Sequence, residues 1–316
     1  MSINTSRCVL LLSAALLPGI SATQERCAPA ATCGHDAVNT AQRTTADVLW
    51  QPSMNVFRRF DVAAEKMFEF YGGALGFQQL STFAVGNGGV ARFQAGAQEL
   101  KLTRRVDDRS YEPGGVAAAT GLRLLTFVFA DEAALMRRFE QHALPAPEFT
   151  QLAGDDRRTA LVTDPDGQPV ELVMAPGAPP EVLTSIEVGL TVADLERSRA
   201  FYRTFVGLEE LPPVHDPRFD TTKYSFRHGA TTISLRSFGR PLPADTGSGG
   251  IQYVVSDVEY VDALAKERRI TIDQPLSGLR GFDLRTIWLD DPDGVTNYFA
   301  ETGASRRARE AVSGSQ

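Results

Sequence analysis

The sequence predicts an α+β protein built from four βαβββ units, which form two tandem domains of the same fold. Two repeated motifs indicate this duplication. The first is LVTDPDGQPVELV at 161–173, which recurs as WLDDPDGVTNYF at 288–299. The second is the helical segment AEKMFEFYGGALG at 64–76, which is matched by LERSRAFYRTFVG at 195–207. Because both motifs recur about one domain length apart, the two halves of the chain are expected to share one fold.

Each motif has a local structural reason. In the Asp-Pro-Asp-Gly segments, Asp, Pro and Gly occupy the first, second and fourth positions that a type I turn prefers. In each helical segment, an apolar residue and a Gly follow a Phe-Tyr pair, and such a Gly is typical of a helix end. The Gly residues concerned are Gly76 and Gly207.

In the first half, apolar periodicity and Gly-rich turns predict the order βαβββ twice. The expected helices are 63–73 and 131–143. The expected strands are 54–62, 77–83, 89–94, 99–104, 122–130, 149–152, 160–163 and 168–174.

The second half follows the same order. The expected helices are 195–205 and 258–269. The expected strands are 185–192, 224–227, 231–237, 251–256, 286–290 and 295–301. The expected segments of the whole chain are a signal peptide (1–22), a flexible tail (23–51), a first domain (52–175), a linker (176–182), a second domain (183–303) and a flexible C-terminus (304–316).

The N-terminal segment has the order of a secretory signal peptide. Arg7 precedes the apolar run 8–20, and small residues follow at Ser21 and Ala22. The run is too short to span a bilayer, so we expect no stable membrane anchor. A periplasmic or secreted protein is therefore expected, with a hydrophobic N-terminus of a cytosolic protein as the alternative.

Composition restricts the partners. The chain has 316 residues, of which 43% are hydrophobic, and its net charge is −7. This negative charge argues against nucleic acid as the partner and favours a small-molecule ligand. Removal of the signal would leave Cys27 and Cys33, an even pair that could form a disulfide in an oxidising compartment.

With these motifs, residues 54–301 resemble the vicinal oxygen chelate superfamily, which includes glyoxalase I, fosfomycin- and bleomycin-resistance proteins and extradiol dioxygenases. The resemblance implies that paired βαβββ units curl into β-cups. It also implies a divalent metal held by side chains of the cup strands, usually His or Glu. One scaffold serves several reactions in this superfamily, so function has to be argued from the site.

The positions that match the implied metal ligands carry few ligands. In the first domain they are Asn55, Lys101, Leu124 and Glu171, and in the second they are Glu187, Ser234, Gly250 and Tyr298. The four His residues of the chain, His35, His142, His215 and His228, fall elsewhere. Each domain taken alone therefore has one carboxylate where a metal site needs about three ligands.

Pairing of units across the two domains would change this conclusion. Glu171 would then meet Glu187, with Ser234 nearby. Two carboxylates and a hydroxyl could hold a hard divalent cation, or the two carboxylates could share a proton as a catalytic acid–base pair. On this alternative the protein is a metal-dependent lyase, isomerase or dioxygenase.

The leading interpretation is a binding cup that needs no cofactor. Asn55 and Tyr298 would offer polar contacts, Lys101 a positive charge, and Leu124 and Tyr253 an apolar wall. This mixture suits an aromatic or amphipathic small molecule. Further residues expected to close over or line the cup are Phe127, His215, Asp216, Arg218, Arg285 and Phe299.

A third interpretation is a non-catalytic interaction scaffold. Exposed sheet edges could pair with strands of a partner protein. A second copy of the chain could be that partner, so a homodimer is a possible assembly.

Overall fold

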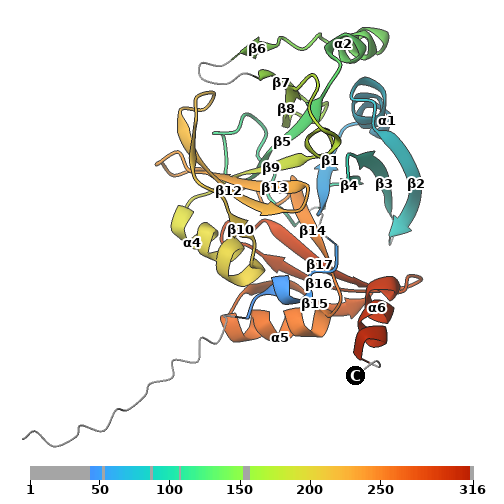
Figure 1. The fold of residues 1–316 in the computed structure, drawn as a ribbon, viewed down its shortest axis with the longest axis vertical. Coiled ribbons are helices and arrows are strands. Elements are labelled where there is room, and N and C mark those ends of the chain that lie inside the picture. Colours follow the sequence, from blue (N-terminus) through green and yellow to red (C-terminus); the bar gives the residue numbers. More distant parts are fainter. Residues whose placement is uncertain (1–42, 52–53, 86–87, 107, 152–156, 314–316) are drawn as a thin grey trace, which may run out of the picture. The chain divides into compact units, whose positions relative to one another are not determined.

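The computed structural model describes residues 43–51, 54–85, 88–106, 108–151 and 157–313, and the residues from Gln42 onward form one compact unit (Figure 1). The predicted signal peptide, Cys27, Cys33 and His35 lie outside the described residues. Within the described part, no helix has the length and apolar character needed to cross a membrane. The unit contains two mixed β-sheets and several helices, as expected for an α+β fold.

The first sheet combines the first and fourth βαβββ units. Its eight strands follow the order β15-β16-β17-β14-β1-β4-β3-β2, and the two units meet where β1 pairs antiparallel with β14. The strands are β1 (Asn55–Phe60), β2 (Gln78–Val85), β3 (Gly88–Ala95), β4 (Gln98–Arg104), β14 (Gly249–Val255), β15 (Thr271–Gly278), β16 (Leu284–Asp290) and β17 (Thr296–Thr302).

The second sheet combines the second and third units. Its path is β10-β12-β13-β9-β5-β8-β7-β6, with β11 paired to β12, and the units meet where β5 pairs antiparallel with β9. The strands are β5 (Gly121–Phe129), β6 (Thr150–Gln151), β7 (Arg158–Thr163), β8 (Pro169–Met174), β9 (Ile186–Thr191), β10 (Glu209–Glu210), β11 (Val214–Asp216), β12 (Thr221–His228) and β13 (Thr231–Arg236). Each sheet therefore takes one unit from each half of the chain.

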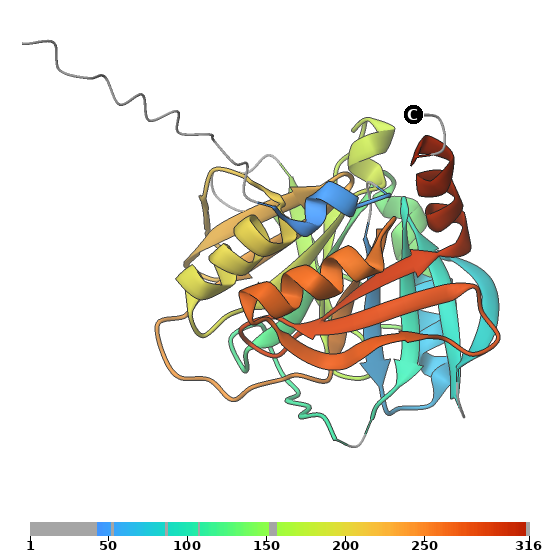
Figure 2. The same cartoon turned by 90° about the horizontal axis from the view of Figure 1, so that it is seen from below.

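In the first half of the chain, the helices of the two units pack against each other. In the first half Phe70 packs edge-on against Phe139, with 6.3 Å between the ring centroids. In Figure 2, α5 lies against the strands of the fourth unit, which it contacts. The helices are η1 (Thr45–Val48), α1 (Ala64–Phe68), η2 (Glu69–Ala74), α2 (Glu132–Gln141), α3 (Pro180–Leu183), α4 (Leu195–Ala200), η3 (Phe201–Val206), α5 (Val258–Arg268) and α6 (Gly303–Ser313).

The repeated motifs bind each other across units. The Tyr71 hydroxyl donates a hydrogen bond to Asp164 Oδ2 at 2.9 Å, and the Tyr202 hydroxyl donates to Asp291 Oδ2 at 2.8 Å. Each Tyr comes from the π-helical end of a Phe-Tyr helix, and each Asp is the first residue of an Asp-Pro-Asp-Gly turn. These bonds join the two units of each half, although those units belong to different sheets.

The second Asp of each turn makes the same link to the backbone. Asp166 Oδ1 accepts from the Asp61 N–H at 2.9 Å, just after the end of β1. Asp293 Oδ1 accepts from the Ala193 N–H at 2.9 Å, shortly after β9. The Asp-Pro-Asp-Gly motif, which identified the duplication in the sequence, thus holds neighbouring units together through hydrogen bonds.

Several elements differ from the sequence-based expectation. Strand β15 was not predicted, because it is polar, contains Pro275 and pairs irregularly with β16. The expected flexible C-terminus forms helix α6, and ion pairs hold it to the rest of the protein. The expected linker contains the short helix α3, and the expected tail contains η1.

Candidate functional site

One face of the first sheet bears a cavity of about 460 Å³, which we call the cavity from here on. Strands β1, β4, β14, β16 and β17 all contribute side chains to it. On β1, Phe57 and Arg59 line the cavity, whereas the alternate residue Val56 is buried in the core. This alternation is the normal consequence of the two-residue period of a strand.

Aromatic rings form one wall of the cavity. The Tyr298 ring stands edge-on to Phe57, with 5.9 Å between centroids, and edge-on to Trp288, with 5.2 Å. Phe57 and Trp288 are only half-buried, although the sheet surrounds them. Their exposed ring surface faces the cavity, where a flat apolar ligand could cover it.

The floor of the cavity is polar and is formed by Lys101 on β4, Gln252 on β14 and Tyr298 on β17. The predicted binding residue Asn55 lies beside this floor but does not line the cavity. Lys101 Nζ donates to Gln252 Oε1 at 2.5 Å, and the Asn55 amide lies 3.5 Å from the same oxygen. The strand register produces this arrangement, because Asn55 pairs with Gln252 and Gln252 pairs with Tyr298. Asn55 itself is held by the Glu99 N–H, which donates to Asn55 Oδ1 at 3.1 Å.

The environment changes the proton affinity of two floor groups. Burial lowers the pKa of Lys101 to about 8, and the carboxylate of Glu99, 3.8 Å away, opposes that change only in part. Burial raises the pKa of Tyr298 to about 12. At neutral pH the floor therefore holds an ammonium group and a neutral phenol.

Charged side chains surround the remainder of the cavity. Arg109 forms ion pairs with Asp273 at 2.5 Å and with Asp290 at 3.7 Å. Arg59 is buried, and its Nη1 donates to the Gly247 carbonyl at 3.3 Å. Among the lining residues, four are cationic (Arg59, Lys101, Arg104, Arg109) and two are anionic (Asp108, Asp273).

On the second sheet, pairing across the halves brings Glu171 and Glu187 to either side of Thr126. Thr126 on β5 pairs with Glu187 on β9 and with Glu171 on β8. Because one strand separates them, the two Glu backbones lie about 10 Å apart. The Thr126 hydroxyl donates to Glu171 Oε2 at 3.0 Å.

Three side chains donate hydrogen bonds to the carboxylate of Glu187. Lys223 Nζ donates to Oε2 at 2.8 Å, Ser234 Oγ donates to Oε1 at 2.6 Å, and Arg236 Nη2 donates to Oε1 at 3.2 Å. Arg236 is almost fully buried, and these acidic neighbours compensate the cost of burying its charge. The expected proximity of Ser234 to Glu187 is therefore present, as a hydrogen bond.

A loop of the third unit brings another cation to Glu171. Arg218 follows β11, and its Nε lies 3.2 Å from Glu171 Oε1. Asp216 on the same segment forms an ion pair with Arg236 at 2.8 Å. Asp216 and Arg218 therefore lie against the second sheet and do not line the cavity that they were expected to close over.

The two carboxylates differ in proton affinity. Burial raises the pKa of Glu171, and repulsion from Glu187 adds to this effect. Burial alone would also raise the pKa of Glu187, but the charges of Lys223 and Arg236 outweigh it and lower that pKa to about 2.

Neither sheet fits the divalent metal that the fold suggests. On the first sheet, one of the positions expected to bind the metal is Lys101. Its ammonium group is positively charged and has no lone pair that could coordinate a metal ion. On the second sheet, Glu171 and Glu187 already bind Arg and Lys side chains, which a metal would have to displace. The donor sets therefore disfavour a metal at both positions.

Two predicted binding residues face elsewhere. Tyr253 lies on the core face of β14, where it stacks on Phe299 with 4.8 Å between centroids, so its neighbour Gln252 faces the cavity instead. Leu124 is fully buried on the second sheet opposite Gly189. Its side chain fills the space that Gly189 leaves, because a Cβ there would lie 2.8 Å from the Leu124 Cβ.

Other predicted lining residues also lie outside the cavity. Phe127 and Phe299 are buried in the hydrophobic core. Arg285 forms an ion pair with Glu259 of α5. His215 is largely exposed on β11, with its side chain 63% accessible.

Apart from Lys101 and Tyr298, the sequence reasoning missed the residues that line the cavity, and the most important of these are Phe57, Arg59, Gln252 and Trp288. Gln252 was missed because the ligand position of the fourth unit was assigned to Gly250, two residues away on the same face of the strand. Alternation predicts the face but not the register, and a shift of two residues leaves the pattern unchanged. Only the cross-strand pairing of β14 with β1 identifies the correct residue.

The remaining described histidines have other surroundings. His142 Nδ1 lies 3.3 Å from Glu69 Oε1, between η2 and the end of α2. Burial lowers the pKa of His228, whose ring lies 6.3 Å from that of Tyr253. Among the described residues, no His lines the cavity.

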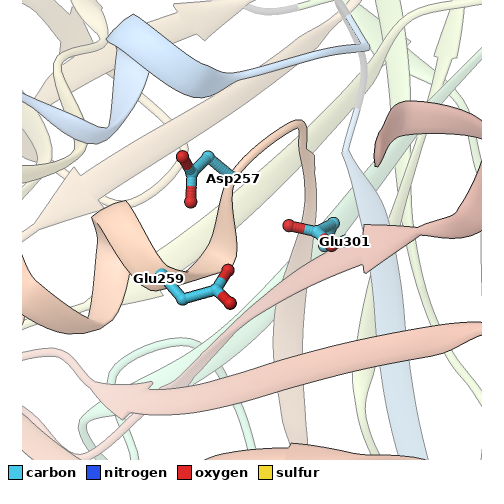
Figure 3. A group of neighbouring side chains, drawn as sticks. All are labelled: Asp257, Glu259 and Glu301. Carbon is cyan, nitrogen blue, oxygen red and sulfur yellow. The ribbon is translucent and has the colours of Figure 1, made fainter. Parts of the chain in front are cut away.

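A separate acidic group lies where α6 meets the fourth unit. The carboxyl groups of Asp257, Glu259 and Glu301 approach one another within 4.8 Å (Figure 3). Arginines neutralise all three: Arg285 pairs with Glu259, Arg306 with Glu301 at 3.3 Å, and Arg309 with Asp257 at 2.6 Å. Asp257 also caps α5, so this group is a structural junction.

Comparison with known proteins agrees with this architecture. The family profile described as Glyoxalase/Bleomycin resistance protein/Dioxygenase superfamily matches residues 54–172 and 185–299. No curated protein matches the sequence.

Solved structures share the fold at low sequence identity. Glyoxalase I from Zea mays is 19% identical, with a TM-score of 0.62, and the match covers 82% of this chain and 96% of that one. A putative dioxygenase from Bacillus subtilis subsp. subtilis str. 168 is 14% identical, with a TM-score of 0.56, and the match covers 79% and 84%.

Proposed function

The chain belongs to the Glyoxalase/Bleomycin resistance protein/Dioxygenase superfamily, and from this premise we propose that it binds a small aromatic or amphipathic organic molecule in the cavity of the first sheet, without a metal centre. The observation that supports this proposal is the aromatic wall formed by Phe57, Trp288 and Tyr298 above a polar floor. A concave site with apolar walls and a few fixed polar groups is the usual form of a small-molecule site.

The volume of the cavity agrees with such a ligand. About 460 Å³ lies within the range of small-molecule sites, and it can accommodate a compound with one or two fused rings. Tyr298 and Gln252 would orient polar groups of the ligand at the floor.

The alternative of metal-dependent catalysis at Glu171 and Glu187 has less support. Lys223, Arg236 and Arg218 already neutralise the two carboxylates, and the charges within this group balance when Asp216 is included. A divalent cation would have to break these ion pairs before it could bind.

A fluorescence titration tests the binding proposal. The chain has two tryptophans, so a Trp50→Phe variant leaves Trp288 as the single reporter inside the cavity. A compound such as 2-naphthol should change the Trp288 emission in a saturable manner and raise the melting temperature, because a ligand that binds the folded state stabilises it.

A pair of variants locates the site. In the Trp50→Phe background, Phe57→Ala should weaken binding by roughly tenfold or more, because it removes ring contact area from the wall. Phe149→Ala is the matched control, since Phe149 is a half-buried aromatic residue outside the cavity. Equal affinities in the two variants, or no saturable binding by a panel of aromatic compounds, would refute the proposal.

We also infer that the protein is exported to the periplasm or secreted. The support is the sequence of Arg7, the apolar run 8–20 and the small residues that follow it. N-terminal sequencing of the full chain expressed in a Gram-negative host should find a mature protein that begins after residue 22. An uncleaved cytosolic product would contradict this inference.

A further inference from the structure

Among the residues that the structure describes, no carboxylate accepts a hydrogen bond from Lys101 Nζ. This Nζ donates to the neutral amide oxygen of Gln252 at 2.5 Å. The nearest carboxylate, that of Glu99, lies 3.8 Å away and accepts two hydrogen bonds from Arg92, at 2.9 and 2.5 Å. The ammonium group therefore has free capacity for an anion from the cavity side.

Arg59 provides a second cation of the same kind. Its side chain is buried and donates to the Gly247 carbonyl. Tyr111 and the carboxylate of Asp273 also interact with it, but among the described residues no carboxylate forms an ion pair with it within 4.0 Å. The carboxylate of Asp273, which also lines the cavity, is bound by Arg109 at 2.5 Å. A buried guanidinium with spare donors favours a ligand that carries acceptors.

Both cations point to the same space. Phe57 pairs with Lys101 across β1 and β4, and Arg59 lies two residues after Phe57 on the same face of β1. Lys101 Nζ lies 5.5 Å from the centre of the Phe57 ring. An aromatic ring placed against Phe57 would therefore carry its substituents toward the two cations.

The charge of the lining agrees with this placement. Four lining residues are cationic and two are anionic, whereas the chain as a whole carries −7. A concave positive region on a negative protein attracts anions and disfavours cationic ligands.

We propose that the ligand of the cavity is an aromatic carboxylic acid, with its ring against Phe57 and Trp288 and its carboxylate bound by Lys101 and Arg59. This inference rests on the proposed function and adds the chemical class of the ligand. A neutral aromatic compound would gain the same ring contacts but would leave both cations without an anion that accepts their hydrogen bonds.

A comparison of two matched compounds tests the inference on the unmodified protein. By isothermal titration calorimetry at pH 7 and low salt, 2-naphthoate should bind 10- to 100-fold more tightly than 2-naphthamide, which has the same ring and nearly the same shape. Equal affinities, or tighter binding of the amide, would overturn the inference while leaving the proposed function intact. Failure of both compounds and of neutral naphthols to bind would overturn the proposed function, and the inference with it.

Variants assign the preference to the two residues. Lys101→Met and Arg59→Met should each lower the affinity for 2-naphthoate at least tenfold and change that for 2-naphthamide less than threefold. Lys66→Met removes one positive charge outside the cavity and should change neither affinity. A parallel loss for both compounds in the cavity variants would show a purely structural effect and overturn the assignment. Circular dichroism confirms that each variant is folded.

Discussion

At the scale of single residues, cationic side chains occupy or neutralise the positions where the family resemblance led us to expect metal ligands. On the first sheet, Lys101 places a fixed positive charge at the floor of the cavity. On the second sheet, Glu187 is held by Lys223 and Arg236. The two faces therefore differ in structure, because the first has a cavity and the second is crossed by ion pairs.

The buried positive charge of Lys101 lowers the free energy of unfolding at neutral pH. Its pKa falls from 10.5 to about 8 on folding, so the folded state binds this proton more weakly than the unfolded state does. The difference corresponds to about 3 kcal/mol below pH 8, and the cost disappears as the pH rises from 8 to above 10.5. Lys101→Met should therefore raise the free energy of unfolding by up to about 3 kcal/mol at pH 7.

Urea unfolding at a series of pH values measures this effect. The advantage of Lys101→Met over the wild type should shrink above pH 8 and vanish near pH 10.5. A constant difference over the whole range would mean that the variant acts through packing and not through the charge.

Glu187 should make the opposite contribution. Its folded-state pKa of about 2 lies below the usual 4.5, so its stabilising effect is complete above pH 4.5 and is lost as the pH falls toward 2. Glu187→Gln should lower the free energy of unfolding by about 3 kcal/mol at pH 7, because Lys223 and the buried Arg236 lose their counter-ion.

Glu209→Gln provides the control for this prediction. Glu209 pairs with Arg227 on the same sheet, but both side chains are more than half exposed, so the loss should stay below about 1 kcal/mol. Thermal or urea unfolding at pH 7 compares the two. Similar losses in both variants would contradict the role assigned to Glu187.

At the scale of elements, the Asp-Pro-Asp-Gly turns and the Phe-Tyr helices form the same set of hydrogen bonds in both halves of the chain. Each turn accepts a Tyr hydroxyl through its first Asp and a backbone N–H of a neighbouring unit through its second. Burial raises the pKa of the first Asp in both copies, but Asp164 lies 3.7 Å from the buried Arg58, whose charge opposes that change. Asp291 has Asp293 as its charged neighbour instead.

This difference predicts opposite effects of one substitution. Burial, with repulsion from Asp293, raises the pKa of Asp291 from 3.8 to about 7, so its ionisation destabilises the fold as the pH rises from 4 to 7. Asp291→Asn should remove this loss and gain at least about 1 kcal/mol at pH 8. Asp164→Asn should cost about 3 kcal/mol, because it leaves Arg58 buried without its counter-ion.

Melting temperatures at pH 5 and pH 8 distinguish the two variants. Asp291→Asn should gain on the wild type between these values, and Asp164→Asn should be less stable than the wild type at both. Destabilisation by Asp291→Asn at pH 8 would show that its carboxylate is needed in the charged form.

Element prediction succeeded where the pattern was local. Most strands of the four units were predicted from apolar runs bounded by turn residues, although the short strands β10 and β11 were not. Both Phe-Tyr helices end as expected before a Gly with positive φ, Gly76 and Gly207. Strand β15 and helix α6 were missed. Both depend on distant partners: β15 on the edge of β16, and α6 on Glu301 and Asp257.

At the scale of the whole molecule, the sheets cross the boundary between the halves of the sequence. Strand β1 pairs with β14, and β5 pairs with β9, so each half supplies one unit to each sheet. Either half alone would expose two long strand edges that are paired in the complete protein.

Separate expression of the halves tests this consequence. Fragments 43–178 and 179–316 should each aggregate or self-associate when produced alone, because β1, β5, β9 and β14 would lack partners. Co-expressed, they should form a 1:1 complex with cooperative unfolding, observed by size-exclusion chromatography and circular dichroism. A monomeric, cooperatively folded single half would contradict the prediction.

The sequence by itself determined the duplicated βαβββ order and the buried face of most strands, because these follow from local periodicity and residue type. Only the tertiary structure decided which strands meet. It joined Lys101 to Gln252, 151 positions apart, and placed Glu171 and Glu187 on either side of Thr126. The reason is physical: alternation defines the face of a strand, whereas the register and partner of that strand depend on packing between segments far apart in the chain.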